Sequence, residues 1–162
     1  MKILVIHQAI DESRADEADT LLQAKEIETH LKNLKHETMR LGFEKIAQLE
    51  MAIWEHKPDA VFNLIESLSG SDRFAYLAPA LLESQKMSFT GNCALPLILA
   101  SEKIKLKHLL SSQGVPTPIG MDANKETRFI VKSVSEHASF GIDEDSIVQG
   151  LSAAQKLIEA KS

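Results

Sequence analysis

The chain has 162 residues and a mass of 17.9 kDa, which is enough for one compact domain with a smaller appendage. Hydrophobic residues make up 44% of it and charged residues 25%, a balance that excludes the disordered, collagen-like and disulfide-rich classes. The formal net charge of -5 supplies no positive field that would attract nucleic acid or an anionic membrane.

Cysteine, histidine and the amino terminus indicate a cytoplasmic protein without a metal site of its own. Cys93 is the single cysteine, so neither an internal disulfide nor a cysteine-rich metal site can form. The six histidines are scattered without an HExxH or paired spacing, and we assign no metal ligands. Residues 1–6 lack the apolar region of a signal peptide, and no apolar run approaches the length of a membrane span. We expect a cytoplasmic protein that contacts neither nucleic acid nor membrane.

The first 91 residues alternate between strand and helix patterns. The aliphatic run 2–6 is typical of a strand that helices cover on both faces, and residues 36–43 predict a weaker second strand. A second helix follows that strand and ends before Pro58. The helix between the two strands has its apolar positions at Leu21, Ala24, Ile27, Leu31 and Leu34.

The strongest buried-strand pattern is at residues 60–65. It leads into a polar loop at 66–72, and a helix at 73–85 and a short strand at 87–90 follow. Residues 1–91 therefore predict an α/β domain with a Rossmann-like parallel sheet. In such folds ligands gather where a strand leads into a loop.

Residues 92–118 predict a helical connector. A short apolar helix at 92–100 precedes a second helix with Ser101 as its N-cap and Gly114 past its end. The stiff segment 115–118 then marks a domain boundary.

The segment 119–162 predicts a strand at 127–134, a loop at 135–143 and a terminal helix. Two such elements cannot bury a core by themselves. We therefore expect residues 119–162 to form only part of a domain.

The loop after the strand at 60–65 holds Glu66 and Arg73, which face a ligand if a crevice opens at this end of the sheet. The structural alternative is that Asp72 caps the next helix and Arg73 is a solvated charge. His7 stands just past the first strand, where it either faces the same crevice or is a buried structural residue. Glu66, Arg73 and His7 are therefore the candidates for the substrate side.

Lysines in the second half are candidates for contacts with an anion. Lys103, Lys105 and Lys107 are spaced by two on a helix, so at most one or two of them face one ligand, and a solvated helix face is the alternative. Lys132 lies inside the apolar run 129–134, where a lysine either points to solvent or meets a charge such as phosphate.

A loop at 136–141 follows this strand and contains Ser139 and Gly141. Its backbone N–H groups and the Ser139 hydroxyl suit a loop that closes over phosphates. A plain β-turn is the alternative interpretation.

Several short motifs stand in one order along the chain, and together they cover nearly all of it. They resemble the D-alanine–D-alanine ligase branch of the ATP-grasp family. The motifs are Val61-Phe-Asn-Leu, Gly70-Ser-Asp-Arg73, Pro79-Ala-Leu-Leu-Glu83, Phe89-Thr-Gly91, Ser101-Glu-Lys103, Gly114-Val-Pro-Thr-Pro118, Phe129-Ile-Val-Lys132 and Ala138-Ser-Phe-Gly141.

The resemblance implies a pre-ATP-grasp domain at 1–91 and an incomplete ATP-grasp small subdomain at 119–162. By the same resemblance Lys103 and Lys132 contact ATP phosphates, while Ser139 and Gly141 belong to the loop over the triphosphate. The family uses ATP and magnesium to phosphorylate a carboxylate, and an amine then attacks the acyl phosphate. A small-molecule substrate is therefore expected.

The chain departs from the family pattern at three places. Residues 7–13 lack the glycine-rich motif that holds the first substrate, so D-alanine is not assured. Ser133, His137 and Ala138 replace family residues around the phosphates. The adenine-binding strand and the magnesium ligands of the family would follow Ser162, so the chain is expected to be truncated and inactive alone.

Other functions stay open. The chain is alternatively one part of a split ligase, completed by a C-terminal partner chain, or a non-catalytic binding or assembly module that forms a homodimer. A receiver domain of the response-regulator type is a weaker alternative, because the strand ending at Asn63-Leu-Ile-Glu66 lacks the phosphoacceptor aspartate.

Overall fold

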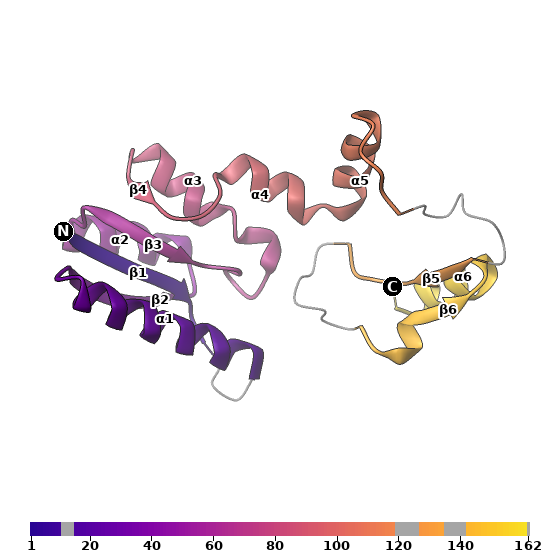
Figure 1. The fold of residues 1–162 in the computed structure, drawn as a ribbon, viewed down its shortest axis with the longest axis horizontal. Helices are drawn as coiled ribbons and strands as arrows, with labels where there is room; N and C mark the ends of the chain where they lie inside the picture. Colours follow the sequence, from indigo (N-terminus) through magenta and orange to yellow (C-terminus); the bar gives the residue numbers. More distant parts are fainter. Residues whose placement is uncertain (11–14, 119–126, 135–141, 162) are drawn as a thin grey trace. The chain divides into compact units, whose positions relative to one another are not determined.

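The computed structural model describes residues 1–10, 15–118, 127–134 and 142–161. The chain divides into two compact units, Met1–Ala100 and Ser101–Ser162 (Figure 1). The finer division expected from the sequence, with limits at residues 91 and 118, stays a prediction.

The first unit is built on a parallel four-stranded sheet, which confirms the predicted α/β class. The strand order is β2-β1-β3-β4, so the first strand of the chain is central. From Ile3 onward every residue of β1 is buried, as its aliphatic run predicts. The elements are β1 (Lys2–Gln8), α1 (Ala15–Asn33), β2 (Glu37–Phe43), α2 (Ile46–His56), β3 (Ala60–Leu64), α3 (Leu77–Ser84) and β4 (Ser88–Phe89).

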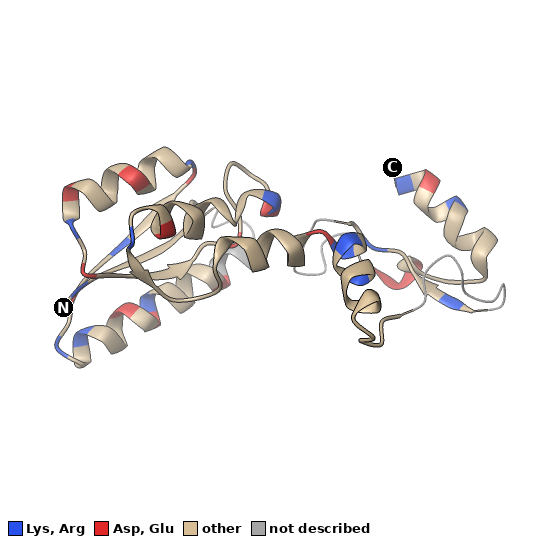
Figure 2. Cartoon of the chain, turned by 90° about the horizontal axis from the view of Figure 1, so that it is seen from above, with Lys and Arg blue, Asp and Glu red and all other residues tan. Residues whose placement is uncertain are grey.

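The two faces of the sheet are covered by different helices. Leu4 and Ile6 share one face, because alternate residues of a strand point the same way, and they pack with α2 and α3. On β2, Arg40 donates to Glu28 of α1 at 3.2 Å, which places α1 on the opposite face (Figure 2). The rest of the main core cluster is Phe43, Leu49, Ala52, Ile53, Val61, Ile65, Leu68, Ala78 and Leu82.

Three sequence-based boundaries in this unit are wrong. The predicted helix at 73–85 is a short 3-10 helix, Asp72–Phe74, followed by α3, and Ser71 rather than Asp72 is the N-cap. Leu34 lies beyond the end of α1 and is exposed, because the chain turns at Lys35 with a φ of 67°.

The helix that follows β4 also differs from its prediction. This helix, α4 (Ala94–Ser101), includes Ser101 as its last residue, so Ser101 is not the N-cap of the next helix. That position belongs to Glu102, whose backbone leaves the helical region with φ -100° and ψ 78°.

The second unit has little core among its described residues. It contains α5 (Lys103–Ser112), the antiparallel strands β5 (Arg128–Ile130) and β6 (Ile147–Gln149), a 3-10 turn (Glu144–Ser146) and α6 (Leu151–Lys161). The strand expected at 127–134 is confined to β5. The strand β6 was not predicted, because three residues are too few to show an alternation of apolar and polar side chains. Among the residues of this unit that the structure describes, Ser146 and Ala154 are buried.

None of the helices in the described parts of the chain combines the length and the apolar character that crossing a membrane requires.

Candidate functional site

The carboxyl end of the first unit's sheet has the geometry of a ligand crevice. The strand β1 lies between β2 and β3, so the chain reverses its direction of winding between β1 and β3. Open parallel sheets bind ligands outside the strand ends at this switch point. His7 and Gln8 end β1 there, and Glu66 follows β3.

Gln8 joins the segments that meet at this switch point. Its side chain is buried, and its Oε1 accepts a hydrogen bond from the backbone N–H of Glu66 at 3.2 Å. Its Nε2 lies 3.5 Å from Oγ1 of Thr20 on α1. One amide therefore links β1 to the loop after β3 and to α1, and it holds Glu66 in place.

The loop after β3 is anchored rather than free. Leu68 is 1% exposed and belongs to the core cluster. Leu68 and Ser71 exchange two backbone hydrogen bonds, at 3.1 and 3.2 Å, around a turn at Ser69 and Gly70. Both turn residues have positive φ, 52° and 74°, as such a tight turn requires. The backbone N–H of Ser69 also donates to the carbonyl of Glu44 at 2.8 Å, which ties the loop to the end of β2.

Glu66 and Arg73 are the exposed charges of this loop. Glu66 stands two residues after β3, and Arg73 lies in the 3-10 helix with its backbone N–H donating to Oγ of Ser71 at 3.3 Å. Both predicted residues thus lie on one anchored loop, with an acid at its start and a base at its end. Their substrate-side roles stay predictions.

His7 has a structural position. It is 6% exposed, and its Nδ1 lies 2.6 Å from the carbonyl oxygen of Gln8, to which it donates. Burial lowers the pKa of His7 below its ordinary 6.5, the hydrogen bond to Gln8 opposes that shift, and the charge of Arg40 adds to it. Its burial and this hydrogen bond agree with the structural alternative for His7, and its substrate-side role stays a prediction.

We expect acid to destabilise the fold through His7. Because its pKa is lower in the folded state, the unfolded chain takes up the proton first as the pH falls below 6.5. The stability contributed by the neutral ring is complete above 6.5 and is lost as the pH falls toward the folded-state pKa. Urea unfolding at a series of pH values should show that the free energy of unfolding falls less steeply with decreasing pH in His7→Gln than in the wild type. Equal slopes in the two proteins would contradict a lowered pKa of His7 in the folded state.

In the second unit, Lys103 is joined to the segment that carries Lys132. The backbone N–H and the Nζ of Lys103 both lie 3.3 Å from the carbonyl oxygen of Val134. Lys132 is exposed and stands two residues past β5 and two before Val134. The structure therefore brings two of the predicted ATP-binding residues to one region of the second unit. The other two, Ser139 and Gly141, lie outside the described residues.

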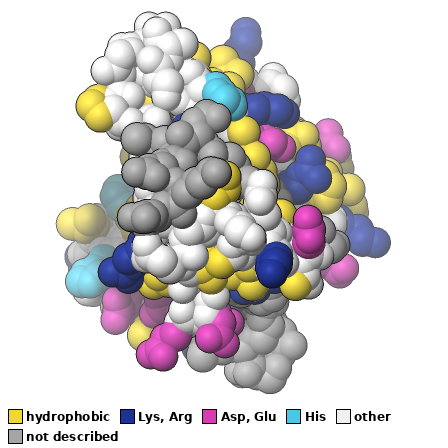
Figure 3. Space-filling model, turned by 90° about the vertical axis from the view of Figure 1, so that its right-hand side faces the viewer, with side chains coloured by type: hydrophobic (Ala, Val, Ile, Leu, Met, Phe, Trp, Pro, Cys, Tyr) yellow, Lys and Arg dark blue, Asp and Glu magenta, His cyan; other side chains and the backbone are white. Residues whose placement is uncertain are grey.

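An apolar surface lies beside Lys132. Ile130 and Ile147 are paired across β5 and β6 and are 50% and 46% exposed, whereas Phe129 and Val148 are half-buried on the other face with α6. Lys132 follows Ile130 by two residues, just beyond the end of β5. Apolar side chains also reach the surface among the charged ones in the space-filling view (Figure 3).

Sequence reasoning missed two contributors to these sites. Gln8 was passed over, although a polar residue at the end of an aliphatic strand is a signal that the strand-end rule provides. Ile147 carried no signal, since β6 is too short to show a pattern. The described residues hold no group of three or more histidine, cysteine, aspartate or glutamate side chains that is placed to bind a metal ion.

Solved structures with the same fold include D-alanine–D-alanine ligases. The Bacillus anthracis ligase aligns with a TM-score of 0.72 at 19% identity, over 99% of this chain and 53% of its own. The chain has the fold of part of a D-alanine–D-alanine ligase. The ATP complex of the Bacillus anthracis ligase has a TM-score of 0.66 at 16% identity over 54% of that chain, and the Helicobacter pylori ligase has 0.61 at 15% over 62%. Both of these alignments also cover 99% of this chain.

A curated sequence shows the same resemblance. The D-alanine–D-alanine ligase of Sphingopyxis alaskensis is 25% identical over 137 residues, 79% of this chain and 43% of the ligase. The uncharacterized protein y4sG of Sinorhizobium fredii is 35% identical over 109 residues, 62% of this chain and 32% of that protein. No protein-family model matches the chain. The expected resemblance to D-alanine–D-alanine ligases is confirmed, and the chain spans less than half the length of these curated relatives.

Proposed function

We propose that this chain carries the substrate-side domain and part of the nucleotide-binding region of an ATP-dependent carboxylate–amine ligase. The observation that carries the proposal is the contact of Lys103 with the carbonyl oxygen of Val134. Because Val134 lies two residues after Lys132, this contact holds Lys103 beside the segment that contains the second predicted phosphate-binding lysine. The similarity in fold to D-alanine–D-alanine ligases, one of which is in complex with ATP, supports the proposal.

The surface around Lys132 has apolar and positively charged side chains that suit the base and the phosphates of ATP. Ile130 and Ile147 offer an apolar platform for a base, and the exposed Lys132, two residues past β5, offers a counter-charge for phosphate. Lys103 adds a second positive charge, although its Nζ already donates to Val134. When bound, ATP would supply the phosphoryl group that activates a carboxylate. We propose magnesium only as the counter-ion of the bound ATP.

The loop of the first unit fits a substrate with both an amine and a carboxylate. The Glu66 carboxylate suits an ammonium group, and the Arg73 guanidinium suits a carboxylate, which it binds in bidentate geometry. The turn at Leu68 and the amide of Gln8 hold this loop at the strand ends, so the charges need no large rearrangement to bind. An amino acid or short peptide is the class of substrate that these charges favour.

We further propose that these 162 residues do not catalyse ligation by themselves. The described residues contain no acidic cluster that would place a metal ion on the phosphates, and phosphoryl transfer depends on such electrostatic stabilisation. Incubation of the chain with ATP, magnesium and amino acids should release no ADP above the uncatalysed rate. ADP release at enzymatic rates that Lys132→Ala abolishes would contradict this proposal.

ATP itself should bind weakly. A charge-assisted contact stabilises a bound phosphate by about 1.5 to 3 kcal/mol, whereas ordering a residue costs about 1 kcal/mol or more. We expect a Kd of about 1 mM or weaker, measured by amide chemical-shift changes during titration with ATP and magnesium. The shifts should include Ile130 and Lys103.

Lys132→Ala should weaken this binding by about 10- to 150-fold, the equivalent of one such contact. Lys156→Ala, which removes an exposed lysine of α6, is the matched control and should leave the Kd unchanged. Unchanged shifts in Lys132→Ala would rule out this surface as the phosphate site. A micromolar Kd in the wild type would instead show that the chain has a complete site.

A further inference from the structure

The helix α2 has apolar residues on its outer side as well as on the side that covers the sheet. Leu49, Ala52 and Ile53 are buried and belong to the main core cluster. On the opposite side of the helix, Met51 is 69% exposed and Trp54 is 79% exposed. Helices at the surface of a domain normally turn polar residues outward, so these two large apolar side chains depart from the usual pattern.

The exposed apolar residues of α2 form a continuous stripe. Ala47, Met51 and Trp54 are spaced by four and three, and at about 100° per residue they fall within an arc of about 60°. Glu50 lies about 40° beyond one edge of the stripe, and Glu55 lies about 40° beyond the other. All five residues are exposed. They form the outer face of α2, an apolar stripe between two acidic edges.

The outer face of α2 has the composition of a protein interface. Isolated apolar side chains are ordinary on protein surfaces, but here they are aligned, and one of them is a tryptophan, a residue type enriched at the energetic centres of interfaces. Neither Glu50 nor Glu55 forms an ion pair with another residue that the structure describes. Both carboxylates are therefore available to a partner.

The charge of the outer face selects among the classes of occupant. Nucleic acids and anionic lipid surfaces are bound through lysine and arginine, whereas here their phosphates would meet carboxylates. A second copy of the outer face would set acid against acid. A segment whose apolar stripe is flanked by lysine or arginine matches both the apolar centre and the acidic edges. That pattern is typical of a basic amphipathic helix.

We propose that the outer face of α2 binds a basic amphipathic helix of a partner protein, independently of the proposed ligase function. The apolar side chains of the partner helix pack on Met51 and Trp54, which removes these two large apolar groups from water. Its lysine or arginine side chains pair with Glu50 and Glu55 at the edges of the stripe. The apolar contacts supply affinity, and the ion pairs fix the position of the bound helix.

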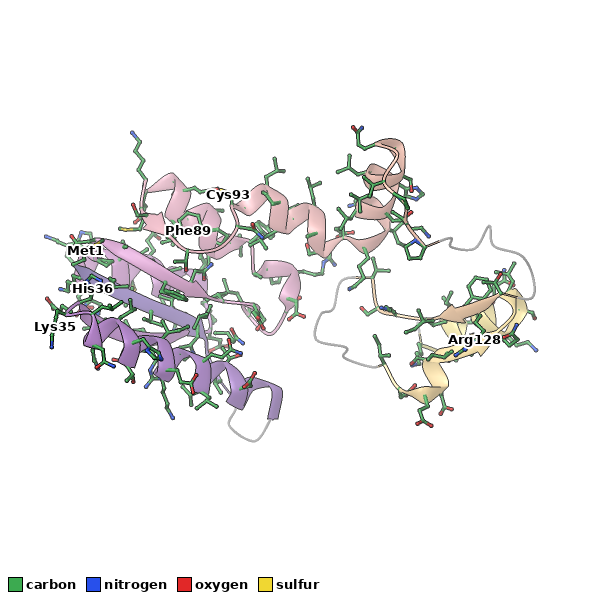
Figure 4. All side chains as sticks on the ribbon, viewed as in Figure 1. Met1, Lys35, His36, Phe89, Cys93 and Arg128 are labelled. Atoms are coloured by element: carbon green, nitrogen blue, oxygen red, sulfur yellow. The ribbon has the colours of Figure 1, made fainter. Side chains whose placement is uncertain are left out.

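The chain contains reporters for this face. Trp54 is the single tryptophan, so tryptophan fluorescence reports the surroundings of the stripe alone. Because Trp54 is 79% exposed, the unbound chain should emit at the wavelength of tryptophan in water and be readily quenched by acrylamide. Cys93 is the single cysteine, is exposed and lies outside α2 (Figure 4). A fluorophore attached to Cys93 measures binding by anisotropy even where Trp54 is replaced.

The probe is a synthetic helical peptide with a stripe of leucine flanked by lysine, and the control peptide has glutamate in place of each lysine. The lysine peptide should bind the wild type and shift the Trp54 emission to shorter wavelength. Trp54→Ala should weaken binding by about 30-fold or more, as expected for an interface hot spot. Glu50→Gln combined with Glu55→Gln should weaken it and reduce its dependence on salt. Leu22→Ala, at a leucine of α1 that is 55% exposed, is the matched control and should leave the Kd unchanged.

Four results would overturn the proposal. Trp54 emission at short wavelength with poor acrylamide quenching in the chain alone would show that its own chain or a second copy covers the face, and light scattering separates these two cases. No binding of the lysine peptide, or equal binding of the glutamate peptide, would remove the role of the acidic edges. Binding that persists in Trp54→Ala would place the peptide elsewhere. Tighter binding to anionic lipid vesicles or to oligodeoxythymidine, with a shift of the Trp54 emission, would assign the face to another class of partner.

Discussion

Replacing Leu68 by alanine is expected to lower the free energy of unfolding by about 2 to 5 kcal/mol, the range found for core leucines. Leu68 lies in a loop, where such a cost is unusual, but its side chain is 1% exposed and belongs to the main core cluster. Removing three carbons there loses the transfer free energy and leaves a cavity beneath the Ser69–Gly70 turn. Urea unfolding monitored by circular dichroism measures the change.

Leu34→Ala is the matched control, because the same side chain is shortened where it is 68% exposed. That variant should change the free energy of unfolding by no more than about 0.5 kcal/mol. A Leu68→Ala variant as stable as Leu34→Ala would mean that the loop is not anchored to the core. The proposal that the loop presents Glu66 and Arg73 in a fixed arrangement would then lose its support.

Gly42→Ala is expected to destabilise the first unit by about 1 to 3 kcal/mol through overpacking. A Cβ at Gly42 would stand 2.8 Å from Cε1 and 3.2 Å from Nδ1 of His7. The imidazole cannot easily move aside, since it is buried and its Nδ1 donates to the Gln8 carbonyl. That carbonyl would itself lie 3.4 Å from the new atom. Chemical denaturation gives the free energy of unfolding.

A double-mutant cycle with His7→Ala separates this clash from a backbone effect. Without the imidazole, the added methyl group meets no ring, and the cost of Gly42→Ala should fall by most of its value. An equal cost in both backgrounds would show that the alanine acts on the backbone of the strand and not on His7. The same cycle tests whether His7 is a packing residue, as its burial indicates.

Much of the first unit could be predicted from the sequence because its signals are local. The aliphatic run of β1 and the run of β3 identify buried strands, and together with the helices between them they require a parallel sheet. Glu66 was also predictable as a loop charge, since a polar segment directly follows a buried strand. Helix ends were less predictable: Ser101 has the side chain of an N-cap, yet the helix α4 continues through it.

The sequence by itself determined the parallel α/β class and the position of Glu66 directly after a buried strand, because alternation and turn chemistry depend on neighbours along the chain. The phosphate-binding roles of Lys103 and Lys132 stay predictions. Only the tertiary structure decided which distant groups meet. Gln8 bonds the backbone of Glu66, 58 residues away, and Lys103 bonds the carbonyl of Val134, 31 residues away. It also decided that His7 is buried against Gly42. Such contacts depend on the register between strands and on the ends of helices, which no local pattern specifies.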